Sequence, residues 1–288
     1  MRYCICVSGG LGHIVLQYLY EHHVDVACVL TDSKSDGIIA YCRENGLPYY
    51  AGNPRNGRAD EWMEQNDMKF DNLLSINYLF ILEADILKRA KLAINFHGSL
   101  LPKYRGRTPH VWAIINGEKE CGITAHLMNT ECDDGDIVRQ IHVQIDDEDT
   151  GADILNKYNA LYPDLVMGIV RDVENGTITY VKQDKVNATY FGKRTPADGH
   201  IDWNWQKERI RNWIRAQAYP YPGAFSYVKG ETIVINKLKY SDLGFNCEME
   251  NGLVIGVEDG KPIVKTPNGA VVLMDINSEN IKIGDVLK

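Results

Sequence analysis

Several kinds of sequence signal are missing from this chain of 288 residues, and each absence narrows what the protein can be. The N-terminus lacks a basic-then-apolar signal sequence, and no apolar run approaches the ~20 residues that cross a bilayer. We therefore expect a soluble, cytoplasmic protein with no membrane insertion. The seven cysteines show no CxxC pair, zinc-type spacing or disulfide framework, which favours reduced thiols.

The chain also has fewer basic than acidic residues. The chain has 31 Lys and Arg against 39 Asp and Glu, a net charge of −8, and a pI near 5.5. It therefore lacks the basic field that holds a phosphate backbone by counterion release. This balance argues against a large nucleic acid as partner.

Two familiar motifs are incomplete. Ser99 follows Gly98 but has no glycine two places on, so the G-x-S-x-G elbow of many serine hydrolases is absent. Gly10 and Gly12 begin a dinucleotide fingerprint, but its third glycine would fall on Val15. We interpret this segment as a tight turn at the edge of a sheet.

The first half of the chain alternates short apolar runs with helical periodicity. The strands expected are 3–7, 24–30, 48–50, 72–76, 92–94, 122–128 and an edge strand at 177–181. The helices expected are 15–20, 36–44, one around 62–63, 84–90, 109–115 and 153–173. This order predicts an α/β fold with a Rossmann-like, mostly parallel sheet covered on both faces.

The second half of the chain has a different residue pattern. A polar segment rich in turn formers at 184–204 is the predicted linker between a larger domain, 1–183, and a smaller one, 205–288. The smaller domain begins with an amphipathic helix at 206–216, in which Ile210, Trp213 and Ile214 share a face. Short strands at 225–229, 232–238, 253–257, 262–265 and 270–274 then predict a small antiparallel, OB-like β domain.

Polar side chains gather after the strand at 92–94. Asn95 and His97 are two residues apart, so they project to one face about 7 Å apart. An Asn amide suits a developing oxyanion, and a His can exchange a proton near neutrality. A carboxylate partner would come from an acidic turn whose members spacing does not rank: Asp133, Asp134 and Asp136. That turn lacks the EF-hand pattern, so we predict no metal.

At these residues the chain resembles a known family. NFHGSLLPKYRG, then GIT, then DDGDIV, is similar to the signature of the folate-dependent formyltransferases, which carry a formyl group from N10-formyltetrahydrofolate to an amine. The resemblance implies that Asn95, His97 and Asp133 are catalytic. Asn95 and a protonated His97 would stabilise the formyl oxygen, while Asp133 would orient His97, raise its pKa and relay a proton.

The resemblance also implies a binding place for the N10-formyltetrahydrofolate cosubstrate. The pterin would lie against the 77–92 segment and the loop before Asp133. The expected cosubstrate contacts are Asn77, Tyr78, Leu79, Ile81 and Asp133. A role in the hydrophobic core is the alternative for the apolar residues among 78–82.

Three acceptor classes occur in this family: glycinamide ribonucleotide, methionyl-tRNA and nucleotide-linked amino sugars. The long segment beyond the linker fits the glycinamide enzymes poorly, since these are essentially the catalytic domain alone. A tRNA needs a positive surface, and the C-terminal part carries the acids Asp242, Glu248, Glu250, Glu258 and Asp259.

Two further segments favour the sugar class. FGKRTPADGHIDW and RIRNWIRAQAYPYPGAFSYV resemble sugar-nucleotide N-formyltransferases, including the formyltransferase domain that formylates UDP-4-amino-4-deoxy-L-arabinose. This implies a product for lipopolysaccharide or O-antigen biosynthesis. The expected substrate contacts are Ser99, Lys103, Arg105, Arg107, Arg194 and Tyr219, with the cations on a diphosphate and Tyr219 or Tyr221 on the base.

Other interpretations stay open at this point. The first alternative is a methionyl-tRNA formyltransferase, and the second is a non-catalytic folate- or nucleotide-binding protein. The sugar, its nucleotide (UDP, GDP or dTDP) and the receiving glycan are not specified by the sequence. Family habit and apolar β surface in the C-terminal half predict a homodimer.

Overall fold

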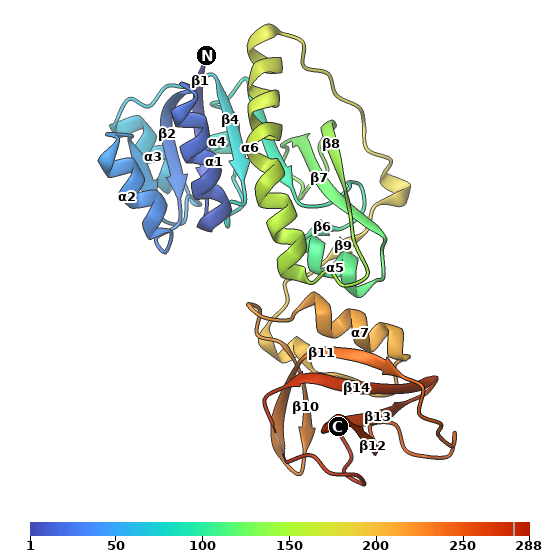
Figure 1. Ribbon diagram of the computed structural model, residues 1–288. Coiled ribbons are helices and arrows are strands. Elements are labelled where there is room, and N and C mark those ends of the chain that lie inside the picture. The colour runs from blue at the N-terminus through green and yellow to red at the C-terminus, as the bar shows by residue number, and fades with distance from the viewer. Residues whose placement is uncertain (279) are drawn as a thin grey trace. The chain divides into compact units, whose positions relative to one another are not determined.

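The computed structural model describes residues 1–278 and 280–288, and the chain divides into two compact units. Unit 1 comprises Met1–Gly106, Gly122–Val143 and Lys157–Tyr190, and unit 2 comprises Arg107–Cys121, Gln144–Asn156 and Phe191–Lys288 (Figure 1). The domain bounds given above remain a prediction.

Unit 1 is built on a seven-stranded sheet with the strand order β3-β2-β1-β4-β5-β7-β8. Its strands are β1 (Arg2–Val7), β2 (Asp25–Thr31), β3 (Tyr49–Ala51), β4 (Asn72–Ile76), β5 (Leu92–His97), β7 (Glu120–Leu127) and β8 (Ile137–Gln144). The strands from β1 to β5 run parallel, and β7 is antiparallel to β5. The predicted α/β class with a mostly parallel sheet is confirmed.

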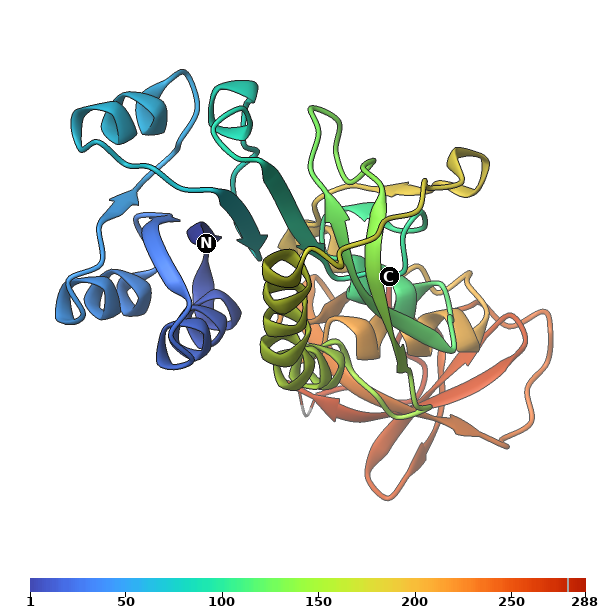
Figure 2. The same cartoon turned by 90° about the horizontal axis from the view of Figure 1, so that it is seen from above.

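Helices cover both faces of this sheet (Figure 2). One face carries α1 (Gly9–Glu21), α2 (Asp36–Glu44) and α6 (Gly151–Asn175), and the other carries α3 (Arg58–Gln65) and α4 (Ala84–Leu87). Under α3 and α4, Met63 and Ile86 pack with Cys4, Cys28 and Leu73 in one buried cluster. The near-continuous apolar strands of the sequence follow from this burial on both sides.

The chain changes direction across the sheet at β1, because β2 and β3 lie on one side of it and β4 on the other. Ligands of such sheets bind beyond the carboxyl ends of the strands near this point. Ser8 follows β1 and Asn77 follows β4, and the Asn77 Nδ2 donates to the Ser8 carbonyl over 3.0 Å. This hydrogen bond ties the two strand ends together.

The edge of the sheet differs from the prediction. The predicted edge strand at 177–181 is wrong, because Val181 makes only one bridge, exchanging two 2.8 Å hydrogen bonds with Ile137, and is 71% exposed. The edge is formed by β8 instead. The sequence does not predict β8, because Arg139 and Gln140 interrupt its apolar alternation.

Unit 2 contains α5 (Pro109–Ile115), α7 (Lys207–Ala216) and a five-stranded antiparallel sheet with the order β10-β11-β14-β13-β12. Its strands are β10 (Ala224–Val228), β11 (Glu231–Ser241), β12 (Val254–Glu258), β13 (Lys261–Thr266) and β14 (Gly269–Ile276). Helix α7 buries Ile210, Trp213 and Ile214, as its periodicity predicts. The predicted antiparallel β sheet of the C-terminal part is confirmed.

The remaining elements are short. They are β6 (Arg105–Gly106), which pairs with β9 (Tyr190–Phe191), and two 3₁₀ helices, η1 (Lys185–Asn187) and η2 (Pro196–Gly199). Among residues 1–278 and 280–288, none of the helices has both the length and the apolar character of a membrane span.

Two glycines differ in how closely other segments of the chain approach them. A Cβ on Gly122 of β7 would lie 2.3 Å from the Ile141 carbonyl oxygen and 2.4 Å from Leu100 Cδ2, whereas a Cβ on Gly10 of α1 would meet nothing within 4 Å. We expect Gly122→Ala to lower the free energy of unfolding by about 1–3 kcal/mol. Gly10→Ala should be neutral or raise it by up to about 1 kcal/mol, since alanine favours helix. Urea denaturation measures the free energy of unfolding of both variants. Equal values for the two would contradict the close approach of Ile141 and Leu100 to Gly122.

Candidate active site

Two neighbouring strands bring four polar side chains to one face of the sheet. Asn95 and His97 lie on β5, and the antiparallel register pairs them with His126 and Thr124 of β7. Paired residues and residues two apart project to the same side. His97, Thr124 and His126 are buried. The predicted common face of Asn95 and His97 is therefore present and gains two further members.

The loop that follows His97 is pinned at its start by buried hydroxyl groups. Thr124 Oγ1 donates to the Ser99 carbonyl over 2.6 Å and accepts from the Leu101 N–H over 3.1 Å. The Tyr158 hydroxyl of α6 donates to the Gly98 carbonyl over 3.0 Å. These bonds fix where the chain leaves β5.

The hydrogen-bond partners of His97 set its tautomer. Its Nε2 lies 2.8 Å from the Tyr104 carbonyl oxygen, which can only accept, so the hydrogen of the neutral ring is on Nε2. Its Nδ1 lies 3.6 Å from Asp133 Oδ2. The lone pair of the neutral ring therefore faces the carboxylate side of the site.

Asp133 is held from several directions. The Gly106 N–H donates to its Oδ2 over 3.0 Å, and Asn95 Nδ2 donates to its Oδ1 over 3.4 Å. Cys132 Sγ lies 3.2 Å from Oδ2. The backbone of Asp133 is left-handed, with φ of 53°, a conformation that Asp tolerates better than most residues. The structure thus brings the three predicted catalytic residues together.

His126 is a polar neighbour that the sequence analysis missed. Its Nδ1 lies 2.9 Å from the Leu127 carbonyl oxygen, and its Nε2 is 3.1 Å from Asn95 Nδ2. The carbonyl requires the hydrogen on Nδ1, so Nε2 accepts from the Asn95 amide. The available signal was the alternation of Thr124 and His126 in the GITAH segment, which places both on one face of a strand.

Burial decides the charge of His97. It lowers the pKa of the ring below the ordinary value of 6.5, and the opposing effects of Asp133 and the Tyr104 carbonyl offset this only in part. Asp133 does raise the pKa of His97, as expected, but less than burial lowers it, and a protonated ring at the formyl oxygen stays a prediction about the reacting state. At pH 7 the imidazole is neutral.

Asp133 remains ionised beside this neutral ring. Burial opposes its ionisation, but the attraction of the His97 ring in its protonated form, the contact with His126 and the Gly106 N–H outweigh burial and hold the pKa of the carboxyl well below its usual range. A neutral imidazole next to a fixed carboxylate can accept a proton, because the imidazolium that forms is stabilised where it forms. The site is therefore equipped for general base catalysis beside an amide donor.

Two of the expected substrate contacts are placed differently. Ser99 is 3% exposed, and its hydroxyl donates to the Lys103 carbonyl over 2.7 Å, so it shapes the loop. Arg105 is 1% exposed, and its guanidinium donates to Asp134 and Gln183 over 2.6 Å each. Packing of the loop turns both side chains inward, and their contact with a substrate stays a prediction.

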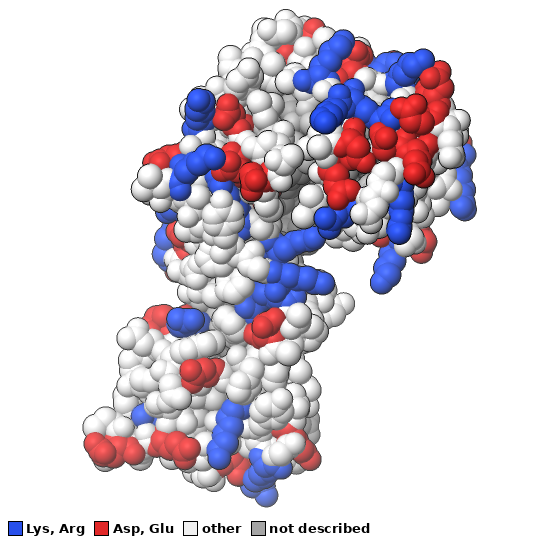
Figure 3. All heavy atoms as spheres, turned by 180° about the vertical axis from the view of Figure 1, so that it is seen from behind, with Lys and Arg blue, Asp and Glu red and all other residues white. Residues whose placement is uncertain are grey.

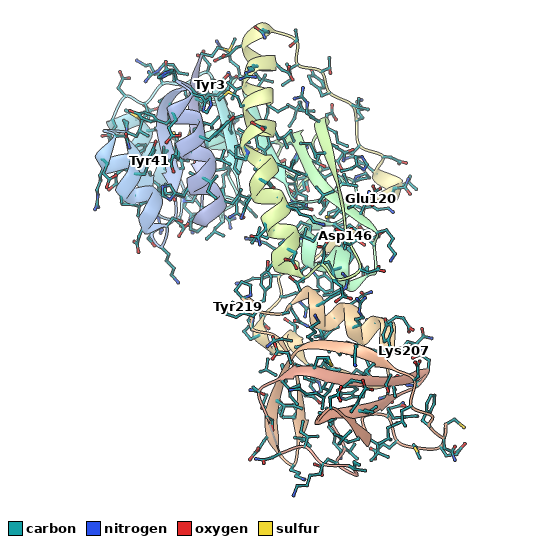
Figure 4. All side chains as sticks on the ribbon, viewed as in Figure 1. Tyr3, Tyr41, Glu120, Asp146, Lys207 and Tyr219 are labelled. Carbon is teal, nitrogen blue, oxygen red and sulfur yellow. The ribbon has the colours of Figure 1, made fainter. Side chains whose placement is uncertain are left out.

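The other expected substrate contacts lie nearer the surface. Lys103 and Arg107 are exposed. In unit 2, Tyr219, labelled in Figure 4, is 83% exposed. The Arg194 guanidinium lies 4.3 Å from the Trp213 ring centre and 5.0 Å from that of Trp112, and it donates to Asp198 and Gln217. Arg194 thus has a packing role whatever else it binds.

The expected cosubstrate residues follow β4. Asn77 uses its Nδ2 on the Ser8 carbonyl, and Tyr78 packs against the core cluster under α3 and α4. Leu79 and Ile81 are 46% and 58% exposed, so they present apolar surface to solvent. The core alternative thus applies to Tyr78, whereas Leu79 and Ile81 are accessible to a ligand.

A cavity of about 450 Å³ lies next to the loop that carries Asp133. Its lining comes from both ends of that loop and from the segment after α6: Leu127, Met128, Asn129, Asp134, Gly135, Asp136, Lys182, Gln183 and Lys185. The lining is mixed in charge, and it does not include Asn95, His97 or Asp133.

Comparisons with known proteins match both parts of the chain. A protein-family model described as formyl transferase matches residues 8–167. A second model, described as the C-terminal domain of formyl transferase, matches residues 193–287. Together the two models cover more than half of the chain.

Solved structures share the fold. One is the N-formyltransferase of Helicobacter canadensis in complex with folinic acid and dTDP-3-aminofucose, with 20% identity, a TM-score of 0.72, and coverage of 95% of this chain and 99% of that chain. Another is WlaRD, a sugar 3N-formyl transferase with dTDP and 5-N-formyl-THF, with 20% identity, a TM-score of 0.68, and coverage of 94% and 96%. HypX from Aquifex aeolicus with tetrahydrofolic acid has 18% identity, a TM-score of 0.67, and coverage of 96% and 44%.

The protonation state of the His97 ring can be tested without any substrate. We expect its ring to titrate below pH 6.5, because burial outweighs the attraction of Asp133. In Asp133→Asn the charge that raises the pKa is lost, so the midpoint should move lower still. NMR titration measures both midpoints, with the signal assigned by its loss in His97→Gln. A midpoint above 6.5, or a rise in the variant, would contradict the electrostatics described here.

Proposed function

The chain belongs to the formyl transferase family, and from this premise we propose that it is a sugar-nucleotide N-formyltransferase. It would move a formyl group from N10-formyltetrahydrofolate to the amine of a nucleotide-linked amino-deoxy sugar. The observation that carries this proposal is the neutral His97 with its Nδ1 3.6 Å from the ionised Asp133, beside the Asn95 amide.

The proposed reaction requires a neutral amine and a group that removes its proton. The amine attacks the formyl carbon, a new C–N bond forms, and the bond from that carbon to N10 breaks. One proton leaves the amine and one reaches N10 of the departing tetrahydrofolate. His97 Nδ1 suits this transfer, because it is unprotonated at rest and becomes a stabilised cation next to Asp133.

The side-chain amide of Asn95 can donate a hydrogen bond to the oxygen of the formyl group. Its Nδ2 donates to His126 over 3.1 Å and to Asp133 over a longer 3.4 Å. The longer contact is the weaker one, so it is the one that a formyl oxygen can replace. As negative charge develops on that oxygen, an amide hydrogen already in place stabilises it without reorganisation.

A folate cosubstrate is supported by the relatives crystallised with folinic acid, 5-N-formyl-THF or tetrahydrofolic acid. In this chain, Leu79 and Ile81 are exposed apolar side chains after β4, at the carboxyl end of the sheet. We propose that they contact the pterin, together with the backbone near Asn77 and the Asp133 loop. Tyr78 is not included, because it packs in the core.

A nucleotide-linked sugar is the proposed acceptor. The support is the dTDP and dTDP-3-aminofucose bound by two relatives of the same fold. Lys103 and Arg107 are exposed cations on the loop after His97, suited to a diphosphate, and Tyr219 offers an exposed ring for the base. Arg194 would contribute only with the part of its guanidinium that its present partners leave accessible.

The alternatives have less support. The net charge of −8 argues against a tRNA backbone, and Figure 3 shows many acidic side chains on the face that it draws. A non-catalytic binding protein would have no need for a buried carboxylate aimed at a neutral imidazole. Entry of the product into a surface polysaccharide is a further proposal that rests on the resemblance, and a cytoplasmic location is a proposal that rests on the lack of a disulfide framework.

A substrate panel tests the function. With N10-formyltetrahydrofolate and dTDP-, UDP- and GDP-linked amino sugars, we expect an N-formylated product from at least one sugar nucleotide, detected by mass spectrometry. His97→Ala should lower kcat by roughly 10²- to 10⁴-fold with little change in KM, because it removes the proton acceptor. His142→Ala, an exposed histidine on β8, is the matched control.

Two results would count against the proposal. Formylation of methionyl-tRNA without any sugar product would move the assignment to the first alternative. Full turnover by His97→Ala would leave the fold assignment in place but remove the mechanism.

We also propose that the protein is a homodimer. The support is the set of exposed apolar side chains in the antiparallel part of unit 2: Leu243, Phe245, Met249 and Val257. Light scattering should give twice the 32.6 kDa of the chain. A single mass of 32.6 kDa at micromolar concentration would refute the dimer.

A further inference from the structure

Two loops hold the reacting pair. Residues 102–107 contact His97 through the Tyr104 carbonyl and Asp133 through the Gly106 N–H, and residues 131–136 carry Asp133 itself. Both loops are hydrogen-bonded to a third segment, residues 183–190, which we name the strap. The strap contains none of the residues assigned above to chemistry or binding.

Gln183 of the strap is bonded to both loops at once. It is 8% exposed, and its Nε2 donates to the Asp133 carbonyl over 2.9 Å and to the Gly135 carbonyl over 2.7 Å. Its Oε1 accepts from Arg105 Nη2 over 2.6 Å. Both amide hydrogens and the amide oxygen are therefore in use, and they join the Asp133 loop to the Arg105 loop.

Arg105 reinforces this link. Its Nη1 donates to Asp134 Oδ1 over 2.6 Å and to the Tyr190 hydroxyl over 2.5 Å. Asp134 also accepts from Lys185 Nζ over 2.7 Å. The strap thus supplies Lys185 and Tyr190 around a buried ion pair whose two members come one from each loop.

The far end of the strap fixes the other loop. Thr189 Oγ1 accepts from the Tyr104 N–H over 2.8 Å, and the Thr189 carbonyl accepts from the Arg105 N–H over 2.8 Å. Tyr104 and Asp133 both have left-handed backbones, with φ of 60° and 53°. Non-glycine residues keep such conformations only where surrounding contacts impose them.

We infer that the strap, chiefly through Gln183, positions the Asp133 carboxylate against the His97 ring and so sets the rate of formyl transfer. Gln183 touches neither reacting atom, so it is a positioning residue. The inference about rate rests on the proposed function. The hydrogen bonding of the strap to the loops of Asp133 and Arg105, which we call the clamp, can be tested without any substrate.

The labelling rate of the Cys132 thiol reports on whether the clamp holds the Asp133 loop. Cys132 is exposed and precedes Asp133, and the other exposed cysteine of the described chain, Cys247, can be replaced by serine. In the Cys247→Ser background, we expect Gln183→Ala to raise the labelling rate of Cys132 by a disulfide reagent roughly tenfold, because a loop released from the strap no longer holds the Cys132 thiol 3.2 Å from the Asp133 carboxylate. Val186→Ala is the control, since that strap side chain is 93% exposed and should leave the rate unchanged.

Kinetics separate positioning from simple stability. We expect Gln183→Ala to lower kcat by roughly 10- to 100-fold with an unchanged KM, since small misplacements cost this much. The acidic limb of its pH–rate profile should move to lower pH, because a more distant Asp133 raises the pKa of His97 less. Gln183→Glu keeps the size but turns an acceptor toward two carbonyls, so it should be impaired at least as strongly.

Thr189→Val, at an exposed position, provides a second variant should the Gln183 variants fold poorly, and it should also speed Cys132 labelling. The inference is overturned if labelling and the pH profile match the unsubstituted protein, or if Gln183→Glu is mild and activity falls only with the folded fraction. A protein that turns over no sugar nucleotide but shows the labelling change would refute the proposed function and keep the clamp.

Discussion

The antiparallel pairing of β5 with β7 is the constraint on which the site depends. Its register places His126 opposite Asn95 and Thr124 opposite His97. A slip of one residue would turn both β7 side chains to the other face of the sheet. Gly122 belongs to the same requirement, because β8 and the loop after β5 approach it too closely for a Cβ. One short segment therefore supplies the register, a pin for the loop and the partner of the Asn95 amide.

A buried carboxylate has to be compensated locally, and here the backbone provides much of that compensation. The Gly106 N–H donates to Asp133, and the side chain of Asn95 offers a second hydrogen. Because burial keeps His97 neutral, the site at rest holds an ionised acid without a full counter-charge in contact. Asp133 offsets part of the cost of placing a positive charge on the buried ring, so His97 can take up a proton during the reaction more readily than burial alone would allow.

The sequence predicted most of the architecture because its signals are local. Helix α2 and the strands β4 and β10 to β14 have periodicity and flanking turn residues that fix them within a few residues. The face shared by Asn95 and His97 also follows from alternation alone. The charge of His97 could not be predicted in the same way, because it depends on burial by segments far along the chain. The same holds for His126, whose contact with Asn95 exists only through the β5–β7 register.

The loop KYRGR shows why resemblance could not rank its cations. Lys103, Arg105 and Arg107 are two apart, so an extended strand would present all three on one face. Left-handed backbones at Tyr104 and Gly106, with φ of 60° and 102°, interrupt the alternation and turn Arg105 inward while its neighbours stay exposed. One motif thus divides its charges between two tasks. The inner arginine supports the loop of Asp133, and the outer two remain at the surface, where they are available to the proposed diphosphate.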